Sequence, residues 1–181
     1  MYHARFSVKI ERNKRNKTRS GIMWARHMYF LIVIVLSFLP FSTYAVPKHI
    51  SAPGEKVIIV DPRSHTWGAY NASGKLLKSG TATAGGKWCP DIGRSCRTKV
   101  GYFRIYTLGS AGCKSSKYPR PRGGAPMPYC MFFNGHQGLH GSYEVVHGNV
   151  SHGCVRVSVS SAKWLRHNFV TIGTKIIIRP Y

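Results

Sequence analysis

Acidic side chains are the residues that this sequence most clearly lacks. Its 181 residues include five Asp and Glu against 27 Lys and Arg, so its formal net charge at pH 7 is +22. Residues 1–27 hold eight basic residues and one Glu, which gives +7 and leaves +15 on the rest of the chain. Such a surplus attracts nucleic acids, acidic wall polymers or anionic lipid surfaces. No known nucleic-acid-binding module is present, so we expect no nucleic-acid partner.

An apolar run long enough to cross a bilayer as a helix is also absent. The main apolar run, Met28–Leu39, has 12 residues, whereas a spanning helix needs about 20. Basic residues precede it and small residues follow it at Ser42–Ala45, the order of a secretory signal. We predict a signal peptide with a long basic start at residues 1–45. The remaining domain, residues 46–181, is then exported to the periplasm or cell envelope.

Two alternatives to this leader remain open. Translation could begin at Met23, which would remove most of the basic start. The leader could also stay attached as an uncleaved membrane anchor. Both alternatives place the remaining domain outside the cytoplasm.

The sequence does not have an even number of cysteines. All five lie after the predicted leader, and an odd number in an exported chain indicates disulfide pairs plus one free thiol. Cys89 and Cys96 bracket a short turn, Cys113 and Cys130 could close a second loop, and Cys154 would remain free. Such bonds stabilise small exported domains. Five free thiols are the alternative, and the sequence does not fix the connectivity.

Short apolar runs dominate residues 46–181, and most are too short to be helices. Only Ser158–Phe169 has a helical pattern, and Ser158 or Ser160 could cap it. Gly109–Pro128 is rich in Gly, Pro, Ser and Lys and predicts a long loop. Many short strands and one short helix predict a mostly β sandwich or barrel. The predicted strands are Lys56–Asp61, His65–Tyr70, Leu76–Ala84, Val100–Thr107, Tyr129–Phe133, Gln137–His140, Val155–Val157 and Lys175–Arg179.

Reactive side chains are concentrated in Leu139–Ser142 and Ser151–Val157. A thiol becomes a strong nucleophile when a neighbouring base favours its thiolate. A His brought close by strand pairing can take that proton and later return it to a leaving amine. We therefore predict that Cys154 and His140 form a catalytic pair. Gly153 removes side-chain bulk before Cys154, so that backbone N–H groups there could stabilise an oxyanion.

This pattern resembles the signature of the L,D-transpeptidase (YkuD-type) catalytic domain. The signature residues are His140-Gly141, followed by Ser151-His152-Gly153-Cys154-Val155-Arg156. Gly123–Tyr129 also resembles a family segment that leads into the site, and the resemblance spans Lys56–Tyr181. The Cys-rich loops are similar to those of the enhanced-entry subgroup of intracellular pathogens. The resemblance implies the β sandwich or barrel of that family.

The resemblance also implies a role for each matching residue. Cys154 would be the acyl-accepting nucleophile, and His140 would be first its base and then its acid. Backbone groups of His152, Gly153 and Cys154 would line the oxyanion pocket. The implied substrate-binding residues are Arg156, Ser151 and Tyr129, with Ser151 also supporting the turn. No cofactor is implied.

The implied reaction is the remodelling of peptidoglycan stem peptides. The thiol would attack the amide after the third residue of a tetrapeptide stem, and an amine on a second stem or protein would accept the acyl group. Two alternatives remain open. Water could accept the acyl group, which would make a carboxypeptidase or endopeptidase, or the basic domain could bind the wall or a host surface without catalysis.

A zinc site is a further alternative for the same residues. His136, His140, His152 and Cys154 are ligand types that zinc accepts. However, glycines around His136 and His140 indicate turns, and the spacing fits no zinc signature. We therefore expect no metal.

Overall fold

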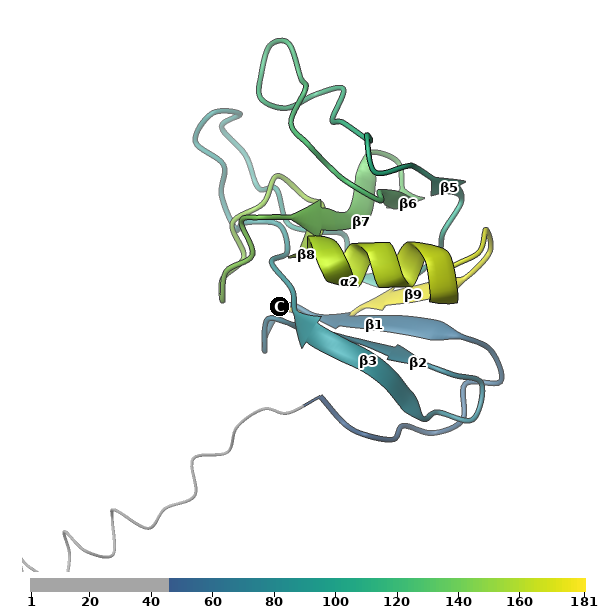
Figure 1. Ribbon diagram of the computed structural model, residues 1–181. Coiled ribbons are helices and arrows are strands. Elements are labelled where there is room, and N and C mark those ends of the chain that lie inside the picture. The colour runs from purple at the N-terminus through teal and green to yellow at the C-terminus, as the bar shows by residue number, and fades with distance from the viewer. Residues whose placement is uncertain (1–45) are drawn as a thin grey trace, which may run out of the picture. The chain divides into compact units, whose positions relative to one another are not determined.

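The computed structural model describes residues 46–181, and the predicted signal peptide at residues 1–45 lies outside them. In the described part, nine strands form two sheets and a short helix packs beside them (Figure 1). The strands are β1 Val57–Asp61, β2 Thr66–Tyr70, β3 Leu76–Thr81, β4 Gly101–Arg104, β5 Thr107–Leu108, β6 Met131–Asn134, β7 Gln137–Ser142, β8 Val155–Ser158 and β9 Lys175–Ile178. Helix α2 spans Val159–Trp164 and continues as the π-helical turn η1, Leu165–Phe169. The prediction of a mostly β fold is confirmed.

The larger sheet has the strand order β3-β2-β1-β9-β4. Strands β1, β2 and β3 form the antiparallel meander that their short connecting turns favour. The last strand, β9, pairs parallel with β1 and antiparallel with β4. The last strand therefore lies inside the sheet, between β1 and β4, where Ile176 and Ile178 are buried.

The smaller sheet has the strand order β5-β6-β7-β8. Strands β6 and β7 form an antiparallel hairpin, whereas β7 and β8 are parallel. Parallel neighbours need a crossover connection of about a dozen residues or more, and residues 143–154 supply it. This crossover ends at Cys154, immediately before β8.

One apolar core lies between the sheets and the helix. It contains residues from both sheets together with Ala162, Leu165 and Phe169 of the helical segment. Ser158 caps the helix, because its Oγ accepts a hydrogen bond from the Ser161 N–H at 3.2 Å. The predicted helix is therefore confirmed in position, although its second half is π-helical.

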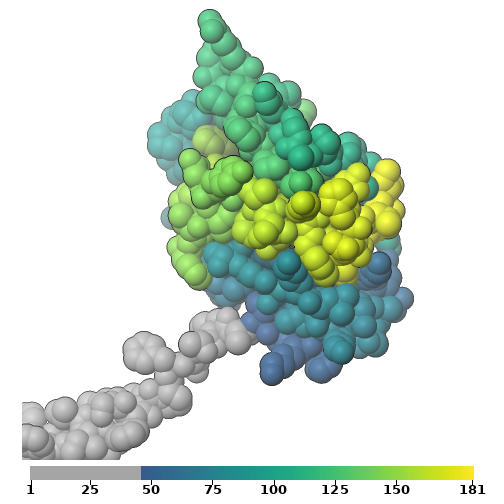
Figure 2. Space-filling view, in the orientation of Figure 1, coloured from purple at the N-terminus to yellow at the C-terminus, as the bar shows by residue number. Residues whose placement is uncertain are grey.

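Two long connections are tied by disulfide bonds. Cys89–Cys96 closes a loop between β3 and β4, and Cys113–Cys130 closes the connection between β5 and β6. The second connection projects from the body as the green protrusion at the top of Figure 2. Among residues 46–181, no helix is both long enough and apolar enough to cross a membrane.

The core predicts a clear contrast between two isoleucines. Ile176 on β9 is fully buried, whereas Ile172 is 68% exposed. Replacing Ile176 with Ala should lower the free energy of unfolding by about 3 kcal/mol, because the lost methylenes leave a cavity. Ile172→Ala should change it by less than about 0.5 kcal/mol. Urea unfolding of the two variants measures both values, and equal losses would contradict this assignment of the core.

Candidate active site

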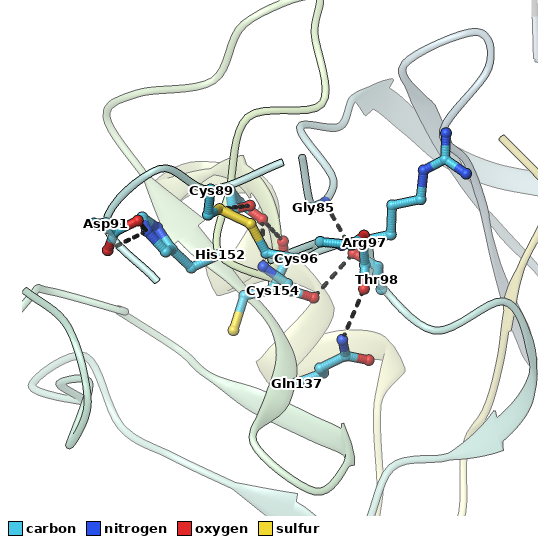
Figure 3. The surroundings of a disulfide bond; sticks show 12 residues. Gly85, Cys89, Asp91, Cys96, Arg97, Thr98, Gln137, His152 and Cys154 are labelled. Carbon is cyan, nitrogen blue, oxygen red and sulfur yellow. Dashed lines mark hydrogen bonds and ion pairs between the residues drawn. A yellow bond between two sulfur atoms is a disulfide. The ribbon is translucent and has the colours of Figure 1, made fainter. Parts of the chain in front are cut away.

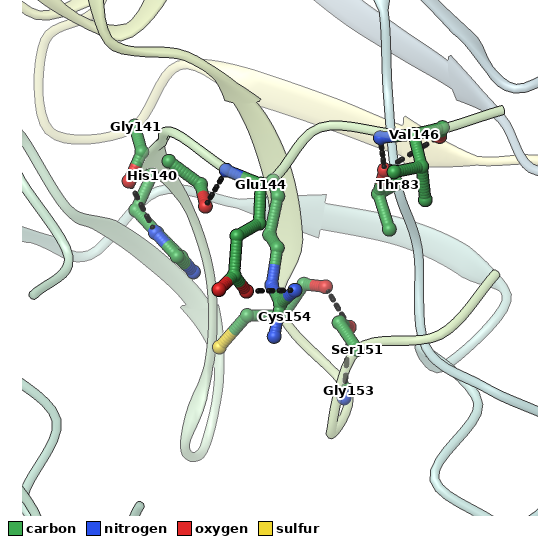
Figure 4. Close-up of polar contacts among 10 residues, drawn as sticks. Thr83, His140, Gly141, Glu144, Val146, Ser151, Gly153 and Cys154 are labelled. Atoms are coloured by element: carbon green, nitrogen blue, oxygen red, sulfur yellow. Dashed lines mark hydrogen bonds and ion pairs between the residues drawn. The ribbon is translucent and has the colours of Figure 1, made fainter. Parts of the chain in front are cut away.

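Strand pairing places His140 and Cys154 on the same face of the smaller sheet. The parallel register pairs Leu139 with Val155 and His140 with Arg156. One step back along this register, Cys154 lies opposite Gly138. Side chains two residues apart on a strand point to the same face, so His140 and Cys154 share a face. In Figure 4 the His140 ring extends from β7 on the side where the Cys154 sulfur lies.

Both residues line a cavity of about 710 Å³. Its walls come from segments that are far apart in the sequence. The two disulfide-bonded loops form one part, and the β6–β7 hairpin and the crossover form the other. The cavity is thus large enough for a peptide-sized ligand.

His140 is held as a neutral base. His140 is only 5% exposed, and burial lowers the pKa of its imidazole to about 4. The positive charge of Arg156 also lowers this pKa, whereas the hydrogen bond with the Gly141 carbonyl raises it. Nδ1 lies 2.8 Å from that carbonyl oxygen. Because a carbonyl only accepts hydrogen bonds, Nδ1 carries the proton and Nε2 keeps a free lone pair.

Cys154 is the one cysteine of residues 46–181 that is outside a disulfide. Its thiol donates to the His136 carbonyl oxygen at 3.6 Å. Burial raises the pKa of this thiol, although a hydrogen bond from the Gly138 backbone and the charge of Arg156 both lower it. The resting pair is therefore a protonated thiol and a neutral imidazole, and nucleophilic attack would require transfer of the thiol proton.

Ser151 fixes the turn before Cys154. Its Oγ donates to the Cys154 carbonyl and accepts from the Gly153 N–H at 3.1 Å. Its backbone also bonds to Ala84 and Gly86. Ser151 is almost fully buried, although it contributes to the cavity lining. Its hydrogen bonds agree with the predicted support of the turn, and its contact with substrate stays a prediction. The Gly153 N–H donates to the Ser151 Oγ, and its role at an oxyanion stays a prediction.

Gly153 occupies a position that few other residues would tolerate. Its φ of +114° is unfavourable for residues with a side chain. An added Cβ would also lie 3.1 Å from Gln137 Nε2. The motif glycine thus serves backbone geometry at the turn.

Arg156 and Tyr129, the other two residues predicted to bind substrate, lie in different places. Arg156 lines the cavity, where it forms an ion pair with Glu144 at 3.3 Å. Tyr129 is not among the residues that line the cavity. Its backbone has a φ of 57°, and its ring packs against the core and His167. The prediction that Tyr129 binds substrate is therefore not supported.

The imidazole of His152 connects the two disulfide-bonded loops. Its Nε2 lies 2.9 Å from both carboxylate oxygens of Asp91 (Figure 3). Its ring also packs against Tyr118 at a centroid distance of 4.3 Å. Asp91 belongs to the loop closed by Cys89–Cys96, and Tyr118 to the loop closed by Cys113–Cys130. The side chain of His152 is thus a structural bridge.

Supporting residues outside the motif could not be found from the sequence. Thr98 Oγ1 donates to the Gly153 carbonyl at 2.9 Å and accepts from the Gly85 N–H at 3.0 Å. The Tyr181 hydroxyl accepts from the Thr98 N–H and donates to the Gly85 carbonyl, both at 2.9 Å. These contacts join three distant parts of the chain behind the turn, and no local pattern marks them.

The zinc alternative finds no matching ligand set in the described residues. The group of His, Cys, Asp and Glu atoms that lie close enough to share a metal is Cys89, Asp91 and His152. Cys89 is bonded to Cys96, so its sulfur is not a thiolate ligand. His136, His140, His152 and Cys154 do not form such a group in residues 46–181.

Comparison with known proteins gives a consistent result. The sequence model of the L,D-transpeptidase catalytic domain family, YkuD, matches residues 55–178. No curated protein sequence matches the chain. Among solved structures, an L,D-transpeptidase from Xylanimonas cellulosilytica is 25% identical with a TM-score of 0.62, and the match covers 74% of this chain and 64% of that chain.

Two more distant structures share the fold. An L,D-transpeptidase from Stackebrandtia nassauensis is 22% identical with a TM-score of 0.57, covering 76% of this chain and 62% of that one. L,D-transpeptidase 3 from Mycobacterium tuberculosis, solved with a faropenem-derived adduct, is 19% identical with a TM-score of 0.56, covering 69% and 60%. The chain thus spans less than two thirds of each of these three structures.

Membership of the enhanced-entry subgroup stays a prediction, because no comparison addresses it. The family itself is shown by the match over residues 55–178, and the two-sheet fold agrees with it. The chain belongs to the L,D-transpeptidase catalytic domain (YkuD) family.

Proposed function

We propose that this chain is an exported cysteine-dependent L,D-transpeptidase that remodels peptidoglycan through an acyl-enzyme on Cys154. One observation carries the proposal. A free thiol and a neutral imidazole with an open Nε2 face the same cavity from adjacent parallel strands. This is the arrangement that nucleophilic catalysis by a thiol requires.

Proton transfer and attack are proposed to occur together. His140 Nε2 takes the thiol proton as the Cys154 sulfur attacks the amide carbonyl after the third stem residue. The C–N bond then breaks, and His140 returns the proton to the leaving D-Ala amine. An amine on a second stem, or on a protein, attacks the thioester and restores the thiol.

The oxyanion of the tetrahedral intermediate would be held by backbone N–H groups. Because the Gly153 N–H already donates to Ser151, we assign this role to the N–H groups of His152 and Cys154. Ser151 contributes by holding their turn in place. Its two hydrogen bonds and its burial make it a positioning residue.

Arg156 is proposed to bind a substrate carboxylate. Its present partner, Glu144, has a side chain that is 82% exposed, and exposed ion pairs are weak. A carboxylate bound in the cavity can therefore replace Glu144 and form a charge-assisted hydrogen bond.

Two disulfides support the proposed export. Such bonds persist in oxidising compartments such as the periplasm, and they tie both loops that line the cavity. The proposed location is the periplasm or cell envelope.

The first test is covalent labelling with a carbapenem. We expect intact-mass spectrometry to show one adduct on the exported domain and none on Cys154→Ala, because the other four cysteines are in disulfides. His140→Gln should slow labelling by about 100-fold or more, since a positioned general base contributes about that much. His167→Gln, which alters an exposed histidine outside the cavity, should label normally. Full labelling of Cys154→Ala would exclude the thiol mechanism.

The second test identifies the acyl acceptor. Purified tetrapeptide stems incubated with the enzyme should lose D-Ala and give cross-linked dimers, as detected by liquid chromatography and mass spectrometry. Free tripeptide without dimers would assign a hydrolytic carboxypeptidase instead. Cys154→Ala should form neither product, and if that variant kept its full biological effect, a non-catalytic binding role would replace the proposal.

The third test is the pH dependence of labelling. Because the pKa of His140 is about 4, its base form is lost only as the pH falls through that value. The labelling rate at pH 5.5 should stay within about 10% of the rate at pH 7, whereas an ordinary His would leave about 10% of it. Arg156→Gln should raise the midpoint of the acid limb, because it removes a positive charge that lowers the pKa of His140. Arg63→Gln, outside the cavity, should leave it unchanged, and a midpoint near 6.5 in the wild type would contradict the buried neutral base.

A further inference from the structure

Every acidic side chain of residues 46–181 already has a basic partner. The pairs are Glu55 with Arg104 and Lys175, Asp61 with Arg179, Asp91 with His152, and Glu144 with Arg156. The other Lys and Arg residues of this part form no ion pair with an Asp or Glu. Their charge is free to act on a partner outside the chain.

The free charges are concentrated in one part of the molecule. Residues 87–122 contain nine Lys and Arg against one acid, Asp91. One of the nine, Arg104, is paired with Glu55, which leaves eight without an acidic partner. All eight are exposed, and we call them the cationic rim. Its members are Lys87, Arg94, Arg97, Lys99, Lys114, Lys117, Arg120 and Arg122.

The two loops that carry the cationic rim are held together. Each contains its own disulfide. Lys87, Arg97 and Lys99 flank the Cys89–Cys96 disulfide. The His152 ring bridges the two loops by bonding to Asp91 and packing against Tyr118. In Figure 1 the two loops extend from the same end of the molecule, on the side of β7 away from β1. The charges of the two loops therefore act on the same region of solvent.

The cationic rim begins inside the cavity and continues outside it. Arg94, Arg97, Lys114 and Lys117 line the cavity that contains Cys154. The remaining four members lie outside its lining. A single stem peptide in the cavity would leave these outer cations without a partner, so they indicate a ligand that extends beyond one stem.

We propose that the cationic rim binds a polycarboxylate, the array of free stem carboxylates that peptidoglycan presents, and so holds neighbouring stems at the cavity. This choice of partner rests on the proposed function. A membrane surface fits less well. No large apolar side chain is exposed between Lys114 and Arg122, and exposed apolar side chains adjoin the cationic rim only at Trp88 and Val100 of the other loop. Several weak exposed contacts acting together give useful affinity through multivalency.

The test compares two variants with the same loss of charge. The rim variant replaces Lys87, Lys99, Arg120 and Arg122 with Gln, all of them outside the cavity lining. The control variant replaces Lys48, Arg63, Lys75 and Lys163 with Gln. These four are also exposed, make no ion pair with an Asp or Glu, and do not line the cavity. The probe is poly-L-glutamate, and binding is measured by fluorescence anisotropy at low salt.

The rim variant should bind poly-L-glutamate about tenfold more weakly than the wild type, and the control variant less than about threefold, because nearby charges dominate a screened interaction. Equal weakening of both variants would assign binding to overall charge and overturn the proposal. Unchanged binding by the rim variant would also overturn it. The proposal would also be overturned if the wild type bound vesicles of anionic phospholipid, or polyphosphate, more strongly than poly-L-glutamate and only the rim variant lost that binding.

Carbapenem labelling separates this proposal from the proposed function. The rim variant should label on Cys154 at the wild-type rate, because none of its four changed residues lines the cavity. If the rim variant labels normally and binds poly-L-glutamate as the wild type does, the proposed role of the cationic rim is overturned and the thiol mechanism is not. A melting temperature equal to that of the wild type verifies that the rim variant is folded.

Discussion

Parallel pairing of β7 with β8 is the constraint on which the site depends. It places Cys154, the residue before β8, opposite Gly138. Gly138 is two residues before His140, so the Cys154 and His140 side chains lie on the same face of the sheet. An antiparallel pairing would give this thiol a different neighbour. The crossover of residues 143–154 is near the shortest that parallel strands allow, so the turn at its end has little freedom. Ser151, Gly153 and Thr98 then fix the turn with hydrogen bonds and a left-handed backbone.

Burial decides the charge state of His140 and Cys154. The domain carries many cations, and Arg156 lies close enough to lower the pKa values of both His140 and Cys154. For the thiol, burial acts in the opposite direction and outweighs the arginine. For the imidazole, burial and the arginine act together. A preformed thiolate–imidazolium pair is therefore disfavoured, and the reaction would depend on moving one proton at the moment of attack.

Local patterns in the sequence predict most strands, the helix cap and the motif. They do not predict the break in Val100–Thr107, which places β4 and β5 in different sheets. The apolar run at β1 and the Ser158 cap depend on neighbours within a few residues, and these are visible in the sequence. The parallel pairing of β1 with β9 depends on residues more than a hundred positions apart and has no local signal. The surroundings of the Tyr129 ring also have no local signal. Its place next to the motif segment suggested substrate contact, but a left-handed backbone turns its ring toward His167.

The orienting partner of His140 is a backbone carbonyl, that of Gly141. Many catalytic histidines depend on an Asp or Asn side chain that one codon change can remove. Here no substitution deletes the acceptor, and damage must come through displacement of the chain. Gly141 is the vulnerable point, because an added Cβ would lie 3.0 Å from the Val159 Cα and 3.1 Å from the Pro128 carbonyl oxygen. The path of β7 at Gly141 thus determines which ring nitrogen of His140 carries the proton. A mutation changes this tautomer only if it displaces the backbone there.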